Sequence, residues 1–449
     1  MIGETKFLGA LSALVKRTKA DGVSVCAHAK TRQVFRFAYE AVHQDLVQDS
    51  VTVTVKVIRG RHVGVAGTDT LEPAGLARCV TAADAIAKHA PEQPLVPPLP
   101  SKTRIKDTTG YSEATARATP AAMAASLQRL FRLCKGAGAA LAGSMMSGED
   151  EFAVANSSGV GCYAASTVSG AKLVTMYHAL SGYASGVHHD ITKLDVEGLL
   201  RRSLQQSLHR TEPAVLPLGT YEVILEPEAV AELVTWLGYT AFGAKSVAER
   251  TSFLAGRMGE QVMDPQVTIY DDGGGRQTLR LPFDFEGTPK RKVVLIDRGR
   301  AAGLVYDGTY GARFGQPSTG HGMPPDETDG PLPLHLAMAP GTARAADLAA
   351  RCARGLLIPR FHYVNGLLNP REALMTGLTR EGTFLIEDGV PTTPVKTMRF
   401  THSILEAFSR VLGVSKERRL VADPSQELGC AVMPTLHLAA FKFTGRSEG

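Results

Sequence analysis

The chain has 449 residues, of which 44% are hydrophobic and 21% are charged, values typical of a globular protein with a large apolar core. Its formal net charge is +5, and its basic residues mostly alternate with acidic ones instead of forming the clustered stripe that follows a phosphate backbone. A nucleic-acid partner is therefore not expected. A membrane partner is not expected either, because no apolar run approaches the ~20 residues that cross a bilayer.

The basic and apolar N-terminal segment predicts an amphipathic helix and not a targeting signal. Phe7 and Leu11 share one helical face, and the acidic residues Glu4 and Asp21 flank the segment. The six cysteines are scattered without a C-x-x-C pair, which predicts buried free thiols in a reducing compartment. We therefore expect a cytoplasmic protein.

Strands and helices alternate in the first half of the chain. Apolar residues at every second position predict strands at 22–28, 51–58, 63–68, 152–156, 161–167 and 171–179. Helical periodicity predicts helices at 72–89, 120–133 and 193–208, and a proline-rich connector lies at 90–100. This pattern predicts one N-terminal domain of the α/β or α+β class, which ends near residue 212.

The character of the sequence changes after the proline-rich segment 211–219. A short strand at 221–225 and a helix that starts at Pro227 come first. Short strands then alternate with Gly/Pro turns, as at 267–270, 292–296, 302–306, 382–386 and 436–441. This pattern favours a barrel or a sandwich. Asp271 to Gly275 is interpreted as a tight hairpin turn in which glycines adopt positive φ.

Histidine-based sites are weakly indicated. The densest group is His188-His189-Asp190, and a shared metal there is disfavoured because neighbouring strand residues point to opposite faces. His321 lies in the Gly/Pro-rich loop 318–325, and loops at the rim of a barrel often carry function. An isolated loop histidine is nevertheless more often simply exposed.

Short motifs follow one another in a fixed order along nearly the whole chain. Examples are Tyr221-Glu222-Val223-Ile224-Leu225-Glu226-Pro227, Gly256-Arg257-Met258-Gly259-Glu260-Gln261-Val262, Asp284-Phe285-Glu286-Gly287-Thr288-Pro289 and Ser318-Thr319-Gly320. Each motif is weak alone, but their common order makes the chain similar to the TldD/PmbA (TldE) family, of the modulator-of-DNA-gyrase type. The resemblance implies an α+β chain, with an N-terminal α/β domain (1–212) followed by a C-terminal antiparallel β-barrel-like domain (213–449).

Catalytic TldD-type members of this family carry His-Glu-x-x-x-His on the helix after the first strand of the second domain. The imidazoles hold zinc and the glutamate polarises water. The matching positions here are Val234, Thr235 and Tyr239, and the surviving Gly238 supports this register. Valine has no ligand atom, threonine is no general base, and tyrosine, with a pKa of ~10, is a poor zinc ligand. The resemblance therefore implies no catalytic residue and no metal site at this helix.

The family's third zinc ligand is a cysteine upstream of a terminal Pro-Thr strand. The stretch that matches its surroundings here is 420–425, which contains no cysteine. Cys430 lies too close to Pro434 and Thr435 to take its place. We interpret Cys430 as a buried strand thiol.

These losses imply a non-catalytic TldE/PmbA-type subunit of a heterodimeric TldD/TldE zinc metallopeptidase. Zinc is expected in the TldD-type partner, and no cofactor in this chain. The substrate is expected to be a small or unfolded peptide, or a peptide-like modification on a metabolite. Thr319, Gly320 and His321 are the residues predicted to line the substrate chamber.

Two alternatives stay open from the sequence. One is an autonomous hydrolase with a rearranged metal site built from His188, His189 or His321. The other is a regulatory or binding protein that needs no TldD-type partner.

Overall fold

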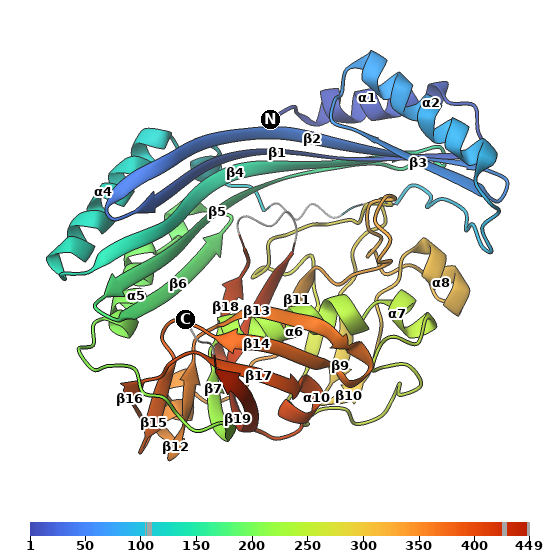
Figure 1. Cartoon of the computed structure of the whole chain (residues 1–449). Coiled ribbons are helices and arrows are strands. Elements are labelled where there is room, and N and C mark those ends of the chain that lie inside the picture. The colour runs from blue at the N-terminus through green and yellow to red at the C-terminus, as the bar shows by residue number, and fades with distance from the viewer. Residues whose placement is uncertain (104, 106–109, 424–428, 447–449) are drawn as a thin grey trace.

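The computed structural model describes residues 1–103, 105, 110–423 and 429–446. Figure 1 shows a long arched sheet from the N-terminal half lying over the C-terminal half. The predicted domain boundary at 212/213 falls between the last helix of the upper half and the first strand of the lower half, and it stays a prediction.

The arched sheet is antiparallel throughout, with strand order β3-β2-β1-β4-β5-β6. Its strands are β1 (Gly22–Ala38), β2 (Ala41–Arg59), β3 (His62–Thr68), β4 (Ala140–Asn156), β5 (Gly161–Tyr177) and β6 (Leu180–His188). The predicted strands at 22–28 and 51–58 are only parts of β1 and β2, which pair from Gly22–Ile58 to Ala38–Ala41. The N-terminal half therefore mixes helices and strands as expected, and its antiparallel sheet makes it α+β, one of the two classes that the pattern left open, instead of the α/β domain that the resemblance implied.

Helices cover one face of the arch, and the other face, which carries apolar patches as well as charged side chains, packs on the C-terminal half. They are α1 (Glu4–Arg17), α2 (Pro73–His89), α3 (Glu113–Ala116), α4 (Pro120–Gly136) and α5 (Val196–Ser207), with a 3-10 turn at Ile191–Lys193. On β1, Val25 and Ala27 pack against Phe7 and Leu11 of α1, which confirms the predicted amphipathic helix. Because side chains alternate along a strand, the intervening residues of β1 point toward the C-terminal half.

The C-terminal half is one mixed sheet that branches at its longest strand. Its strands are β7 (Gly219–Leu225), β8 (Ile269–Asp271), β9 (Val293–Asp297), β10 (Arg300–Ala301), β11 (His335–Met338), β12 (Arg354–Ile358), β13 (Phe361–Asn369), β14 (Leu374–Thr379), β15 (Phe384–Glu387), β16 (Val390–Pro394), β17 (Met398–Ser403), β18 (Val411–Val421) and β19 (Cys430–Arg446). The main path runs β10-β9-β8-β11-β19-β7-β12-β15-β16, and β17 and β18 also pair with β19.

This sheet does not confirm the predicted barrel-like architecture. Across the described residues the path ends at β10 and β16 without closing. Two of its pairs, β11 with β19 and β7 with β12, are parallel, so the sheet is not purely antiparallel. Short strands separated by Gly/Pro turns fit an open, branched sheet as well as a barrel, which is why the pattern misled.

The two faces of β7 carry different helices. The helices of this half are α6 (Pro227–Ala241), α7 (Ala244–Ala248), α8 (Gly308–Phe314), α9 (Ala345–Ala350) and α10 (Ile404–Ala407), with a 3-10 turn at Pro370–Glu372. Val223 and Leu225 of β7 belong to the same apolar cluster as α6. Ile224, which points the other way, packs with Leu348 of α9. The sheet thus separates an α6 side from an α9 side.

Three smaller predictions have clear outcomes. All six cysteines are buried and free, as expected. Within the described chain, no helix combines the length and apolar character needed to cross a bilayer. The tight hairpin at Asp271 to Gly275 was wrong, because β8 pairs with the distant β9 and none of the three glycines has positive φ.

Candidate functional site

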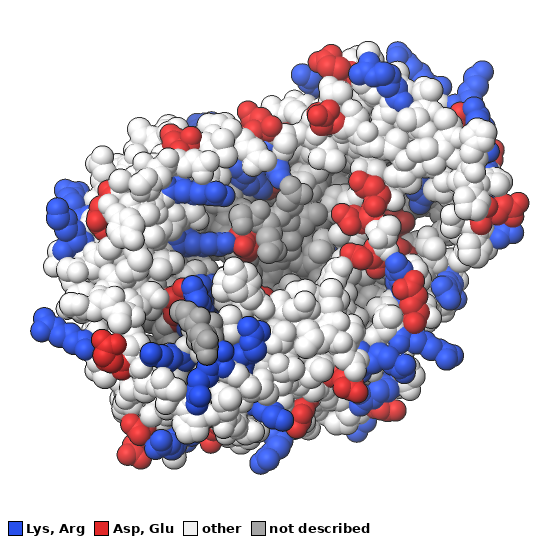
Figure 2. Space-filling view, viewed as in Figure 1, with Lys and Arg blue, Asp and Glu red and all other residues white. Residues whose placement is uncertain are grey.

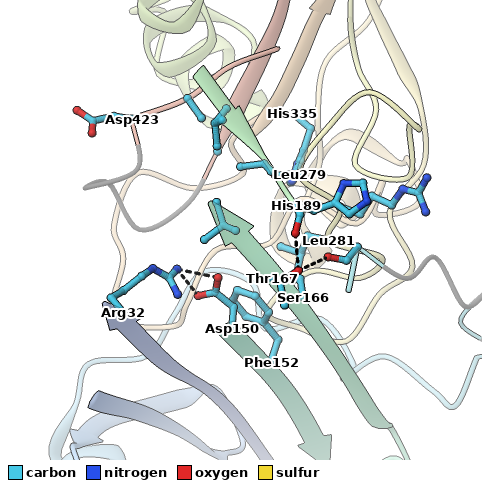
Figure 3. Close-up of a pocket in the computed structure, with 16 residues that line it drawn as sticks. Arg32, Asp150, Phe152, Ser166, Thr167, His189, Leu279, Leu281, His335 and Asp423 are labelled. Carbon is cyan, nitrogen blue, oxygen red and sulfur yellow. Dashed lines mark hydrogen bonds and ion pairs between the residues drawn. The ribbon is translucent and has the colours of Figure 1, made fainter. Parts of the chain in front are cut away.

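A cleft lies between the arch and the C-terminal half, on the face of the arch that the helices do not cover. Figure 2 shows it as a hollow in the middle of one face of the molecule, with charged side chains along its rim. The pocket within it is lined from both halves, by residues of β1, β4 and β5 on one side and by Leu279, Leu281 and His335 on the other (Figure 3). Both halves are therefore needed to form this site.

The wall of the pocket that the arch forms carries a buried ion pair. Arg32 of β1 binds Asp150 of β4 (Figure 3). His28 Nε2 lies 2.8 Å from the same carboxylate. The His28 ring stacks on Phe152 at 4.2 Å. Although burial opposes ionisation, the His28 hydrogen bond and the Arg32 charge hold the pKa of Asp150 below its usual value. The wall therefore presents a fixed, fully paired charge cluster.

A second charged cluster lies at the N-terminal end of α6. Arg419 Nη2 lies 2.9 Å from Glu226 Oε2 and 3.0 Å from Glu228 Oε2. Arg202 of α5 approaches Glu228 to 3.9 Å from the other half of the chain. Burial, followed by repulsion from Glu226, raises the pKa of Glu228 to about 8, against the opposing pull of the arginines. One of these two carboxyls can thus hold a proton near neutral pH.

The charged face continues along α6. Burial raises the pKa of Glu232, one turn after Glu228. Arg360 stacks over Tyr183 of β6 at 4.0 Å and pairs with Glu381 at 2.6 Å. Clusters of carboxyls with shifted pKa values in a cleft are common at functional sites, although structural ion networks shift pKa values as well. Chemically, this face can bind polar or cationic groups and exchange protons.

The three positions that match the family's zinc motif lie on the same helix. Val234 is fully buried in the apolar cluster, whereas Thr235 is exposed and Tyr239 is 43% exposed. Burial, followed by the nearby charge of Asp329, raises the pKa of Tyr239, so its phenol stays neutral. These side chains do not fit a zinc ion, because one has no donor atom and none is an anionic or imidazole ligand.

Gly238 has a packing role in this helix. A Cβ atom at this position would lie 2.7 Å from Leu336 Cδ1 of β11. The glycine therefore allows α6 to approach the sheet closely, and this packing role does not depend on a zinc site at the neighbouring positions.

The loop of Thr319, Gly320 and His321 is more buried than its sequence indicates. His321 is 1% exposed, so the expectation of an exposed histidine was wrong. Its Nδ1 lies 2.9 Å from Thr319 Oγ1, and its Nε2 lies 2.9 Å from Asp271 Oδ1. Burial and then Lys290 lower the pKa of His321, which keeps the ring neutral in this chain of hydrogen bonds. The role of the loop as a chamber wall stays a prediction.

His188 and His189 lie at the end of β6. Their rings stack at 4.5 Å, so the reasoning that they point to opposite faces was wrong. His188 Nδ1 accepts a hydrogen bond from the Asp190 amide, which occupies one of its two nitrogens. Among the described residues, no group of three metal-type side chains includes either histidine.

Cys430 begins β19 and is buried, which confirms its interpretation as a strand thiol. Its sulfur accepts a hydrogen bond from the Leu279 amide at 3.3 Å. Positions 424 and 425 of the stretch compared with the family's cysteine ligand lie outside the described residues.

Sequence reasoning missed both charged clusters, the one in the pocket wall and the one at the start of α6. Their members are far apart in the chain, as Arg32 is from Asp150 and Glu228 is from Arg419, and no motif joins them. The available signal in the sequence was a charged residue at an inward-facing position of a strand, such as Arg32 in β1, which indicates a buried ion pair.

Comparison with known proteins places the fold and the family. Residues 218–445 match the model of the PmbA/TldA metallopeptidase C-terminal domain. The chain is 28% identical to the metalloprotease TldD homolog of Haemophilus influenzae over 53% of this chain and 48% of that protein. It is 24% identical to a metalloprotease of Methanothermobacter thermautotrophicus over 50% of this chain and 49% of that protein. In both cases the matched part spans less than half of the relative's length.

The structure is also similar to that of TldE from Thermococcus kodakarensis. The TM-score is 0.87, with 21% sequence identity, over 97% of this chain and 100% of that chain. At this level of identity the match concerns the fold, which extends over both halves. Because the family model covers half of the chain and the motifs follow one order, the chain belongs to the PmbA/TldD family of metallopeptidase-type proteins.

Proposed function

We propose that the chain is the non-catalytic, TldE/PmbA-type subunit of a heterodimeric TldD/TldE zinc metallopeptidase that acts in the cytoplasm. The observation that carries this proposal is the side-chain set on α6. Val234 is in the apolar core, and the exposed Thr235 and Tyr239 supply neither zinc ligands nor a general base. The zinc ion and the water-activating glutamate are assigned to a TldD-type partner.

The cleft supports a role in holding substrate. The pocket contains the paired Arg32–Asp150 cluster and is lined by residues of both halves. The carboxyls at the start of α6 form a second charged cluster that also joins the two halves, through Arg202. Extended peptides are commonly bound through their backbone beside sheets, with charged side chains fixing their position. The proposed substrates are therefore small or unfolded peptides, or a peptide-like modification on a metabolite.

The partner is proposed to complete this chamber. Thr319, Gly320 and His321 are retained as proposed chamber-wall residues, with Thr319, which is half-buried, as the side chain best placed for contact. Gly320 and His321 would act by fixing the loop, since both are buried.

The association is tested by co-expressing the chain with a TldD-type protein from the same genome. We expect the two proteins to co-elute as a one-to-one complex that cleaves an unfolded reporter peptide. Arg419→Ala in this chain should raise KM more than it lowers kcat, because the residue positions the carboxyls at the start of α6 and touches no reacting atom. Arg117→Ala, an exposed arginine on α3's C-terminal side, is the matched control. Failure to co-elute, or an unchanged KM, would count against the proposal.

A further inference from the structure

Three metal-type side chains meet on the α9 side of the C-terminal sheet. They are Glu222 of β7, Cys352 between α9 and β12, and His437 of β19, and their ligand atoms all lie within 4.8 Å of one another. Glu222 Oε1 lies 2.7 Å from His437 Nε2. Within the described part of the chain this is the one such group of three, and neither the zinc-motif positions nor the cleft residues contribute to it.

Strand pairing and backbone hydrogen bonds position these three side chains. β7 and β19 are antiparallel neighbours in which Ile224 pairs with His437, so Glu222 lies diagonally across from the imidazole on the same face. The flanking residues Val223 and Leu225 point to the opposite face and pack with α6. The group therefore lies on the face of the sheet opposite to α6.

Cys352 is fixed by backbone contacts on both sides. Its amide donates to Ala349 O at 3.0 Å, and its carbonyl accepts from the Gly389 amide at 3.0 Å. A Cβ atom on Gly355 would lie 2.5 Å from the Cys352 sulfur. Because Gly355 has no side chain, the Cys352 sulfur can occupy this space and face Glu222.

We propose that Glu222, Cys352 and His437 bind one divalent cation of the zinc type, with water as the fourth ligand. Thiolate, imidazole and carboxylate together are a typical zinc ligand set. His437 and Cys352 are almost completely buried, whereas the Glu222 side chain is 29% exposed. The ion and its water would enter from the Glu222 side.

The spacing of the three ligand atoms suits this ion. Ordinary Zn–S, Zn–N and Zn–O bond lengths in a tetrahedron put neighbouring ligand atoms roughly 3.4 to 3.6 Å apart. The 2.7 Å contact between Glu222 and His437 is a hydrogen bond that a bound cation would replace. Only a small rotation of the partly exposed Glu222 side chain is needed to open it.

Binding is coupled to loss of one proton. Burial, followed by the hydrogen bond to Glu222, raises the pKa of Cys352 to about 12, so the thiol is protonated at neutral pH without a metal. The cation forms a bond to sulfur as the S–H bond breaks, and that proton passes to the buffer. The Nε2 proton of His437, which faces Glu222, moves to Nδ1 through water, so that Nε2 has a lone pair for the cation and no second proton is released. No oxidation or reduction is involved.

This metal site goes beyond the proposed function. Either proposal can be wrong without affecting the other. The cation would join β7, β19 and the start of β12 on the sheet face away from α6. It is a metal-binding site that is independent of peptidase activity. Zinc found in the single chain would therefore be bound here and would not by itself indicate a catalytic centre.

The test is metal titration of the full-length chain after treatment with a chelator and dialysis. We expect one equivalent of zinc, release of one proton per ion, and a thiolate-to-metal charge-transfer band when cobalt replaces zinc. Cys352→Ala and Glu222→Gln should weaken binding by more than the roughly 10- to 100-fold that loss of an outer-shell partner causes. Cys134→Ala, which removes an equally buried thiol remote from the site, should bind as the natural chain does.

Two outcomes would overturn the proposal. One is the absence of zinc or cobalt binding at micromolar free metal. The other is binding that is unchanged in Cys352→Ala. Glu222→Gln keeps the test decisive if the buried cysteine variant does not fold, because Glu222 is partly exposed and glutamine has the same shape.

Discussion

Arg32 Nη2 donates hydrogen bonds to both oxygens of Asp150, at 2.8 and 2.7 Å, in the wall of the cleft. Both side chains are 10% exposed, so breaking the pair leaves a buried charge without compensation. We expect Asp150→Asn to lower the free energy of unfolding by about 3–5 kcal/mol, measured by urea denaturation at neutral pH. Because the pKa of Asp150 is lowered in the folded chain, its contribution is present above the ordinary aspartate pKa and is lost as the pH falls.

The matched control is the exposed pair of Arg117 and Glu113, with side chains 82% and 68% exposed. Glu113→Gln should change the free energy of unfolding by less than about 1 kcal/mol. Equal effects of the two substitutions would show that burial does not govern the Arg32–Asp150 pair.

Glu228 should make stability depend on pH in the opposite direction. Burial, followed by Glu226, raises its pKa from 4.5 to about 8, so the folded chain holds this proton more tightly than the unfolded chain. This contribution is full below pH 4.5 and is lost as the pH rises to about 8. We expect Glu228→Gln to flatten the decline in unfolding free energy over this range, measured by denaturation at several pH values. Glu92→Gln, at an exposed pair, should leave the slope unchanged.

Two features of the structure require glycine at position 320, its positive φ and the close approach of neighbouring backbone. Its φ is +76°, and a Cβ atom would lie 2.4 Å from Pro289 O. Gly256 has a similar φ of +80° with nothing within 4 Å of such an atom. We expect Gly256→Ala to cost about 1–2 kcal/mol for the angle alone and Gly320→Ala clearly more, in thermal or urea unfolding. Equal costs would contradict the close approach of the loop to Pro289.

Restoring the family's zinc motif should lower the free energy of unfolding substantially at one position and little at the other two. Val234→His would bury an imidazole in an apolar cluster, and we expect a loss of about 2 kcal/mol or more in unfolding free energy. Thr235→Glu and Tyr239→His change exposed side chains and should stay within about 0.5 kcal/mol of the natural chain. A tolerated Val234→His would mean that the core around α6 can rearrange to expose this position.

The sequence was informative where the pattern was local. The helix of Pro227 and the helix of Phe7 were predicted correctly, because an apolar stripe of period 3.6 and a helix-starting proline depend on near neighbours alone. The lengths of β1 and β2 were underestimated, since their distal halves carry charged or polar residues such as Arg32 and Gln48, which face the cleft or solvent.

The site was less predictable, because its contacts join distant segments. The buried partner of His321 is Asp271, fifty positions earlier, which only the folded chain brings within 2.9 Å. In the same way, Glu222 and His437 come from opposite ends of the C-terminal half and meet because β7 pairs with β19. Neither contact leaves a spacing in the sequence that could be recognised.

The most direct test of the proposed role is to measure which chain carries peptide hydrolysis. The rate of cleavage of an unfolded peptide should be measured for this chain, for a TldD-type chain and for their complex, in each case also with Cys352→Ala in this chain to separate any metal bound there. The account predicts cleavage by the complex, its loss when the partner's motif glutamate is replaced by glutamine, and no cleavage by this chain alone. Sustained, metal-dependent cleavage by this chain without a partner would contradict the account.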